Sequence, residues 1–255
     1  MKYHRNLLVI IALLALLASS CSKEGNGIPN YPSNSRLKQI VLYQDITSTT
    51  PIAIVQQFEY DESGRISKTS SPMYENGVIK GTISYNLYEY NFLGQLSKIS
   101  TYNANSNSPD GFINLYNKVY SYYGNGLLAR ENTEYPAGTT QDFIIYDYDG
   151  DRLTKVSMFS NNLLSSYTIN NYDNSGNLVK ESTYAANGEG TFYTIHSYNG
   201  NLRIKSDVYV SSSNDHYRTI TRTYDSNGNL VILESKELMP YSNMTSFVQR
   251  YEYTD

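Results

Sequence analysis

His196 and His216 are the side chains of this sequence best suited to acid–base chemistry, because histidine changes charge near neutral pH. A third histidine, His4, lies between Lys2 and Arg5 at the N-terminus, in what we predict below to be a signal peptide. His196 occupies a strand position at which other parts of the chain carry aromatic residues, so we expect it to pack in a sheet rather than act as a base. His216 follows Asp215 in a polar loop, and we expect it to be solvated.

Motifs that hold a nucleophile, a zinc ion or a phosphate are missing from the sequence. It contains no Gly-x-Ser-x-Gly, no His-Glu-x-x-His and no Gly-x-x-x-x-Gly-Lys. We therefore predict that the protein is not an enzyme and uses no cofactor. The alternative is a hydrolase with an unrecognised site, which would lose its activity when His196 or His216 is replaced by alanine.

Three alternating acids, Asp147, Asp149 and Asp151, are of the type that begins a calcium-binding loop. The glycine of such a loop is at the wrong place here, and no bidentate glutamate follows at the required distance. We interpret the three acids as turn residues and predict no metal site, with weak Ca²⁺ binding as the alternative.

Cys21 is the only cysteine, which excludes a disulfide framework and a cysteine-based metal site. Before it, Lys2 and Arg5 precede an apolar run of 12 residues, Leu7 to Ala18. A helix of that length reaches roughly 18 Å, whereas a bilayer core is about 30 Å thick. Residues 1–20 are therefore predicted to be a signal peptide rather than a membrane span.

The sequence Leu17-Ala18-Ser19-Ser20-Cys21 resembles the lipobox of bacterial lipoproteins, in which the cysteine becomes the lipidated first residue. The resemblance implies lipidation of Cys21, a membrane as partner, and a place on the outer membrane at the cell surface or the periplasmic face. Two or more acyl chains anchor a protein stably. The alternative for Cys21 is a thiol left for pairing with another molecule.

Residues 21–35 contain glycine and proline among polar residues, which predicts a flexible tether. The chain after the signal peptide has 18 basic and 24 acidic side chains. A mildly acidic body argues against a nucleic-acid partner, because binding to phosphates needs basic patches.

The rest of the chain is organised by a recurring turn, of which Tyr172-Asp173-Asn174-Ser175-Gly176-Asn177-Leu178 is one copy. Asp and Asn side chains fold back on their own backbone, and glycine accepts the positive φ that closes such a turn. The anchor tyrosines are spaced by 30, 32, 26, 24, 26 and 26 residues. The predicted turns are marked by these tyrosine and glycine pairs: Tyr60 and Gly64, Tyr90 and Gly94, Tyr122 and Gly126, Tyr148 and Gly150, Tyr172 and Gly176, Tyr198 and Gly200, and Tyr224 and Gly228.

A regular interval of this length indicates units that cannot bury their own apolar surface. The residues around each turn alternate with period two, as strands require. Arg36 to Gln44 and Phe247 to Tyr253 have the pattern of a leading and a trailing half-unit. We predict an all-β domain over residues 36–255, an antiparallel meander of β-hairpin repeats that curls into a partial or closed barrel.

Basic residues stand eight positions after several anchors, at Lys68, Lys98, Arg130 and Lys180. If the anchor pairs with the leucine or isoleucine six residues later, each basic side chain is expected beside an aromatic ring, which attracts its charge.

The repeated Tyr-Asp-x-x-Gly-x-Leu pattern resembles the YD-repeat (RHS) family over roughly residues 58–233. In large members of that family the repeats wind into a hollow β-shell that encloses a toxin. The resemblance implies a hairpin-repeat fold and a surface location, and it implies no particular activity.

Tyrosine is abundant, with 27 residues, and amphipathic rings on a rigid sheet suit contact with glycans or proteins. Regular spacing favours cross-strand packing for most of these rings. Tyrosines outside the anchor series lie in or near the loops, and these are the candidate ligand contacts: Tyr102, Tyr135, Tyr184, Tyr209 and Tyr241. We predict a membrane-anchored, non-catalytic binding or structural module for a glycan or protein, with a periplasmic scaffold as the alternative.

Overall fold

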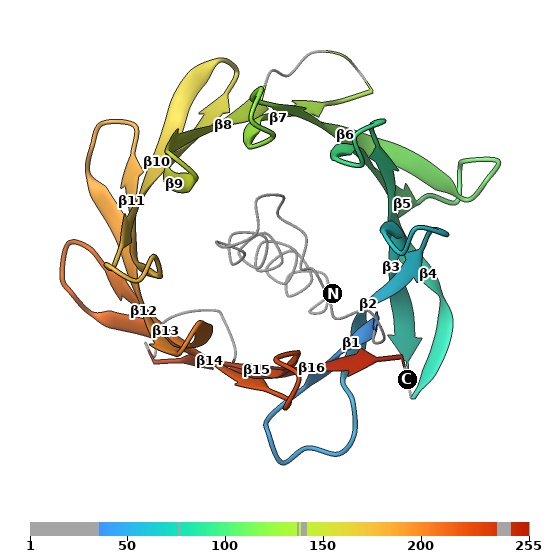
Figure 1. Ribbon diagram of the computed structural model, residues 1–255. Coiled ribbons are helices and arrows are strands. Elements are labelled where there is room, and N and C mark those ends of the chain that lie inside the picture. The colour runs from blue at the N-terminus through green and yellow to red at the C-terminus, as the bar shows by residue number, and fades with distance from the viewer. Residues whose placement is uncertain (1–35, 76, 137, 139–141, 239–245, 255) are drawn as a thin grey trace.

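Sixteen antiparallel strands, in the part of the chain that the structure describes, form a closed ring around a central axis (Figure 1). The structure is a computed structural model, and it describes residues 36–254 except 76, 137, 139–141 and 239–245. The predicted signal peptide and tether lie outside the described residues. The strands are β1 (Leu37–Tyr43), β2 (Ala53–Tyr60), β3 (Ile66–Glu75), β4 (Val78–Tyr90), β5 (Leu96–Ala104), β6 (Phe112–Tyr122), β7 (Leu128–Glu134), β8 (Asp142–Asp149), β9 (Arg152–Ser160), β10 (Leu163–Tyr172), β11 (Leu178–Ala185), β12 (Gly190–Asn199), β13 (Leu202–Val210), β14 (His216–Tyr224), β15 (Leu230–Glu237) and β16 (Phe247–Tyr253).

Each strand pairs with the strands before and after it in the chain, and β1 pairs with β16. Extensive contacts among the described strands join only such neighbours. The all-β hairpin meander expected from the sequence is therefore confirmed, and the sheet closes completely.

The predicted turns connect strands at one end of the barrel, which we call the turn rim. At the β2–β3 turn, the backbone N–H of Gly64 donates to the carbonyl of Asp61, and the Asp61 side chain accepts from the backbone N–H of Arg65. Gly64 has φ +80°, a conformation that a residue with a Cβ adopts only with strain. The opposite end, the loop rim, carries the connections between one hairpin and the next, such as residues 161–162 between β9 and β10.

A register shift follows every anchor pair and decides which way the basic residues point. Tyr60 lies opposite Ile66 as expected, but Glu59 lies opposite Lys68, so Ser67 is the extra residue of a bulge. The bulge puts Lys68 on the face opposite to the anchor. There it pairs with Glu59 and lies over the ring of Tyr85 in the next hairpin, 5.6 Å from its centroid.

Arg130 and Lys180 likewise lie over Phe143 and Tyr193 of the following hairpin, whereas Lys98 forms an ion pair with Glu89. The expectation of a ring beside each basic residue is therefore wrong for Lys98, and the other rings belong to the next unit. Without the bulge these side chains would share the face of the anchors.

Most anchor tyrosines join their hairpin to the one before it. The hydroxyl of Tyr90 donates to the carbonyl of Ile66, the first residue of the preceding β3 strand, at 2.8 Å. The same bond recurs around the barrel at 2.7–3.0 Å from Tyr60, Tyr122, Tyr172, Tyr198, Tyr224 and Tyr253. The anchor hydroxyl of one unit thus satisfies a backbone carbonyl of the preceding unit. A single hairpin would lack this bond and the apolar contacts of its neighbours, so we do not expect it to fold alone.

The two half-units at the chain ends form the last repeat. Tyr253 lies opposite Leu37, and the backbone N–H of Thr254 donates to the carbonyl of Arg36 at 2.8 Å, as Asp61 does to Arg65 in a continuous turn. Two buried apolar clusters lie at this seam, one formed by Leu37, Ile40, Leu42 and Val55 and the other by Val41, Tyr43 and Val248.

Candidate functional site

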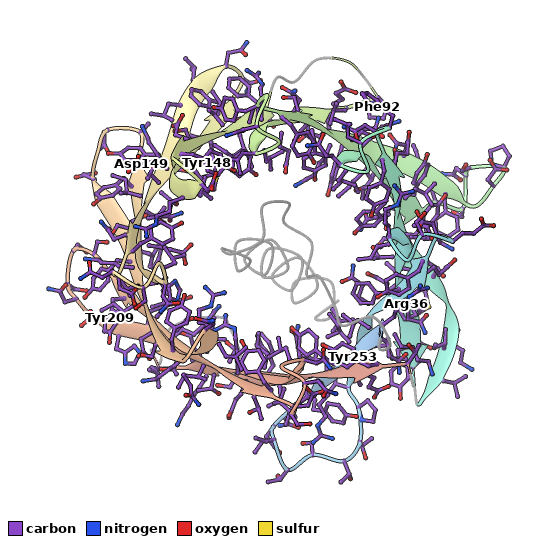
Figure 2. The ribbon with its side chains drawn as sticks, viewed as in Figure 1. Arg36, Phe92, Tyr148, Asp149, Tyr209 and Tyr253 are labelled. Atoms are coloured by element: carbon purple, nitrogen blue, oxygen red, sulfur yellow. The ribbon has the colours of Figure 1, made fainter. Side chains whose placement is uncertain are left out.

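The wall of the barrel has an inner and an outer face, and the repeat specifies what each unit places on them. Figure 2 shows Tyr148 on the inner side of the wall and Asp149 on the outer side. The strand register puts all anchors on the inner face, together with the residue two before each anchor and the residue opposite it. In the β2–β9 half, the residue two before the anchor is aromatic: Phe58, Tyr88, Tyr120 and Tyr146.

Three of these inner positions carry basic side chains in the β12–β14 sector. His196 and Arg222 stand two before their anchors, where the other half of the barrel has aromatic residues. Arg203 lies opposite the anchor Tyr198, where most units have leucine or isoleucine. We call the cluster of Glu181, His196, Arg203, Ser206 and Arg222 the basic sector.

His196 is fixed from both sides within the basic sector. Its Nδ1 lies 2.9 Å from Ser206 Oγ and its Nε2 lies 2.7 Å from Glu181 Oε2. Burial lowers the pKa of the imidazole, the hydrogen bond to Glu181 opposes that effect, and the charge of Arg203 adds to it. His196 is therefore a packed sheet residue, neutral at pH 7, as expected from the sequence.

Arg222 and Arg203 place two positive charges on the inner wall. An Nη1 N–H of Arg222 donates to Ser206 Oγ at 2.9 Å. Burial, and next the proximity of Arg203, lower the pKa of the Arg222 guanidinium to about 10, so Arg222 stays charged at neutral pH. Neither forms an ion pair with any residue that the structure describes.

Other charges on the inner face are neutralised by a direct partner. Lys118 pairs with Glu131 at 2.8 Å, and Arg218 pairs with Glu237 at 3.2 Å. Glu181, the acid of the basic sector, is hydrogen-bonded to the neutral His196 and so offsets only one of the two arginine charges. The sector thus keeps a net positive charge, which a bound anion would neutralise.

Glu181, His196 and Ser206 are hydrogen-bonded in the order of an acid, a base and a nucleophile. A substrate, however, cannot reach the Ser206 oxygen. Ser206 is only 2% exposed, and its oxygen already accepts from Arg222. A substrate carbonyl must come within about 3 Å of a nucleophile. The arrangement therefore suits the fixing of Arg222 better than attack by Ser206.

His216 belongs to a separate cluster on the outer face. Its Nε2 lies 3.1 Å from Asp207 Oδ1, an atom that also accepts from the Thr219 hydroxyl at 2.8 Å. Asp207 Oδ2 pairs with Lys205, and the His216 ring stacks on Tyr209 with centroids 4.7 Å apart. His216 is held by these contacts while its side chain stays 36% exposed, so the expected solvation describes only part of its surroundings.

Three of the candidate ligand tyrosines lie near strand ends close to the loop rim, and each stacks on a ring of the neighbouring strand. Tyr102 stacks on Tyr85, Tyr184 on Tyr167, and Tyr209 on Tyr193, with centroids 4.7–5.0 Å apart. The neighbouring rings, Tyr85, Tyr167 and Tyr193, also carry a cation: Lys68, Lys155 and Lys180 respectively. Stacking thus covers one face of Tyr102 and of Tyr184, whereas Tyr209 is stacked on both Tyr193 and His216.

The remaining sequence candidates are placed differently. Tyr135 follows β7 directly and its hydroxyl donates to Asp142 Oδ2 at 3.3 Å. Tyr241 and Cys21 lie outside the described residues. Asp147 and Asp149 end β8, and over the described ranges no three acidic, histidine or cysteine side chains are grouped so that they could hold a metal ion.

Over the described residues, the chain has no helix of the length and apolarity needed to cross a membrane.

No family model matches the chain, and no curated protein matches it. Among solved structures, it is similar to a porin-like protein from Bacteroides vulgatus, with 12% identity, 86% of this chain and 98% of that chain covered, and a TM-score of 0.41. A porin-like protein from Bacteroides uniformis has 9% identity over the same shares of the two chains and a TM-score of 0.35. A DUF3836 family protein from Parabacteroides distasonis has 14% identity, 41% of this chain and 85% of that chain covered, and a TM-score of 0.25.

Sequence reasoning selected neither Arg203 nor Arg222, although a signal for them is present. When the repeats are aligned, Arg203 occupies a position that is leucine or isoleucine in most units, and Arg222 occupies a position that is often aromatic. The alternation in the sequence does not show which face is concave, so it could not tell that these departures meet on the inner wall.

Proposed function

We propose that the protein is a non-catalytic binding module of the bacterial cell envelope, anchored to the outer membrane through a lipid on Cys21, and that its barrel binds an anionic group at the basic sector. We further propose that it belongs to the YD-repeat proteins, because of its Tyr-Asp-x-x-Gly-x-Leu hairpins. The observation that carries the binding function is the placement of Arg203 and Arg222 on the inner wall without an ion-pair partner among the described residues.

The repeat itself argues for function at these positions. Leucine and aromatic residues satisfy the structural role in the other units, and burying a charge in their place is costly. Arg203 and Arg222 carry this unfavourable burial at neighbouring positions, which supports a role for their charges in binding a ligand. Guanidinium groups bind carboxylate, sulfate and phosphate through paired hydrogen bonds.

An acidic glycan is the ligand class that best fits both the charge and the surroundings. Its carboxylate or sulfate would bind the two arginines, while tyrosines such as Tyr198 and Tyr224 beside them offer ring surface to the sugar. A protein ligand would have to present an acidic segment to the same wall.

The test is binding of the purified full-length lipoprotein, in detergent, to an array of acidic and neutral oligosaccharides. We expect signal on uronate or sulfated glycans, with a loss of tenfold or more in affinity in Arg203→Leu and in Arg222→Tyr. Arg130→Leu is the control, because Arg130 lies over Phe143 on the outer face. Equal binding by all variants, or binding of neutral glycans alone, would show that the basic sector does not bind the ligand.

A hydrolase is the second candidate, favoured by the hydrogen-bonded order of Glu181, His196 and Ser206. It requires turnover of an ester or glycoside panel that disappears in Ser206→Ala. A periplasmic scaffold, the remaining alternative, is separated by protease treatment of intact cells, which would leave a periplasmic body uncut.

A further inference from the structure

The β4–β5 turn differs from the other turns in the residues at its tip. Phe92, labelled in Figure 2, is 96% exposed and Leu93 is 68% exposed, so the turn presents two apolar side chains to solvent. The two corresponding residues are polar in the β2–β3, β10–β11 and β14–β15 turns: Glu62 and Ser63, Asn174 and Ser175, and Ser226 and Asn227. The turn geometry needs no apolar residue there, because the Asn91 side chain accepts from the backbone N–H groups of Leu93 and Gln95.

The polypeptide enters the barrel at the same rim. Arg36 precedes β1 and reaches the β2–β3 turn, where its Nη2 lies 2.9 Å from the place of a Cβ on Gly64. β1 then runs towards the loop rim, because Tyr43 at its far end precedes the connection to β2. Everything before Arg36 is therefore attached at the turn rim, on the side of Phe92 and Leu93.

We propose that the turn rim docks on a lipid bilayer and that Phe92 and Leu93 insert into its interface. This inference rests on the proposed anchoring at Cys21. The tether from residue 21 to 35 has an average span of about 20 Å as a flexible chain. The loop rim lies roughly 30 Å further along a nine-residue strand such as β9.

An apolar turn beside the tether can reach the membrane without reorienting the barrel, whereas Leu163 on the loop rim cannot. Two apolar side chains bind a bilayer weakly by themselves, but the lipid anchor keeps them at its surface, where they orient the body. Docking in this way points the loop rim away from the membrane.

The chain has no tryptophan, so one substitution creates a single fluorescent reporter. Phe92→Trp reports on the turn rim, and Leu163→Trp is the matched reporter on the loop rim, where Leu163 is 74% exposed. Each full-length lipidated variant is reconstituted into phosphatidylethanolamine–phosphatidylglycerol vesicles with and without dibrominated phosphatidylcholine, and flotation measures retention.

We expect bromolipid to quench Phe92→Trp by half or more and to leave Leu163→Trp unchanged. Adding Leu93→Asp to Phe92→Trp should reduce the quenching. If the protein floats with the vesicles but bromolipid quenches Leu163→Trp, or quenches neither reporter, the docking of the turn rim is contradicted. The lipid anchor would still be supported, because flotation shows that the protein is on the membrane. Failure to float would overturn the anchor and the docking together.

Discussion

Tyr253, near the end of the chain, lies opposite Leu37 in the pairing that Tyr60 makes with Ile66 inside a continuous hairpin. The chain ends therefore build the last repeat of the barrel without a covalent turn. The seam is reinforced by buried apolar clusters and by Arg250, whose Nη2 donates to the carbonyls of Ile46 and Ser48 in the β1–β2 loop. Closure thus depends on side chains of both ends of the body.

Removal of the Tyr253 hydroxyl tests the bond that joins β16 to β15. Tyr253→Phe deletes the donor to the Leu230 carbonyl and should lower the free energy of unfolding by about 1 kcal/mol. Tyr253→Ala also removes the ring and should lower it by about 3–5 kcal/mol. Urea unfolding followed by circular dichroism measures both. Tyr74→Phe is the control, since no hydrogen bond of its hydroxyl is found among the described residues; a similar loss there would assign the effect to tyrosine replacement in general.

Gly176 tests the turn that recurs along the chain. Its φ is +83°, so Gly176→Val should lower the free energy of unfolding by about 1–3 kcal/mol. Gly124, in the β6–β7 turn, has an ordinary φ and open space around the position of a Cβ. Gly124→Val should therefore have a clearly smaller effect on the melting temperature. Equal melting temperatures for the two variants would contradict the role of positive φ.

Replacing Arg203 by leucine, the residue that most other units have at this position, should make the protein more stable. Arg203→Leu removes a buried charge from a leucine position and should raise the free energy of unfolding by about 1–2 kcal/mol, while anion binding is lost. The backbone bond from the Tyr224 hydroxyl to the Arg203 carbonyl does not depend on the side chain. Thermal unfolding without glycan measures the change. A destabilised Arg203→Leu protein would show that the arginine is there for the fold.

His196 should make stability depend on pH. Burial lowers the pKa of its imidazole below the value of about 6.5 in the unfolded chain, so below pH 6.5 the unfolded chain binds the proton more readily. This contribution to stability is complete above pH 6.5 and is lost as the pH falls towards the pKa of the folded state. Denaturant unfolding at pH 7.5 and pH 5 should therefore show a loss of stability that is smaller in His196→Gln. His216→Gln is the control and should keep the loss; the same loss in His196→Gln would assign it to other groups.

Much of the architecture follows from local rules that the sequence displays directly. Strand alternation, the Asp and Gly of each turn, and the regular interval predict hairpins joined in a meander. They also predict the half-units at the chain ends. The direction of the basic residues was not predictable in the same way, because one bulge residue such as Ser67 reverses the face of Lys68.

The sequence by itself determined the units, since turn chemistry and period-two patterning act over a few neighbouring residues. Only the tertiary structure decided that the sheet closes, which face is concave, and that Arg203 and Arg222 meet His196 there. Closure is a property of accumulated twist and strand number, and pairing between β1 and β16 joins residues more than 200 positions apart. Local sequence patterns do not predict a pairing between such distant residues. The basic sector could therefore be recognised only from the closed barrel.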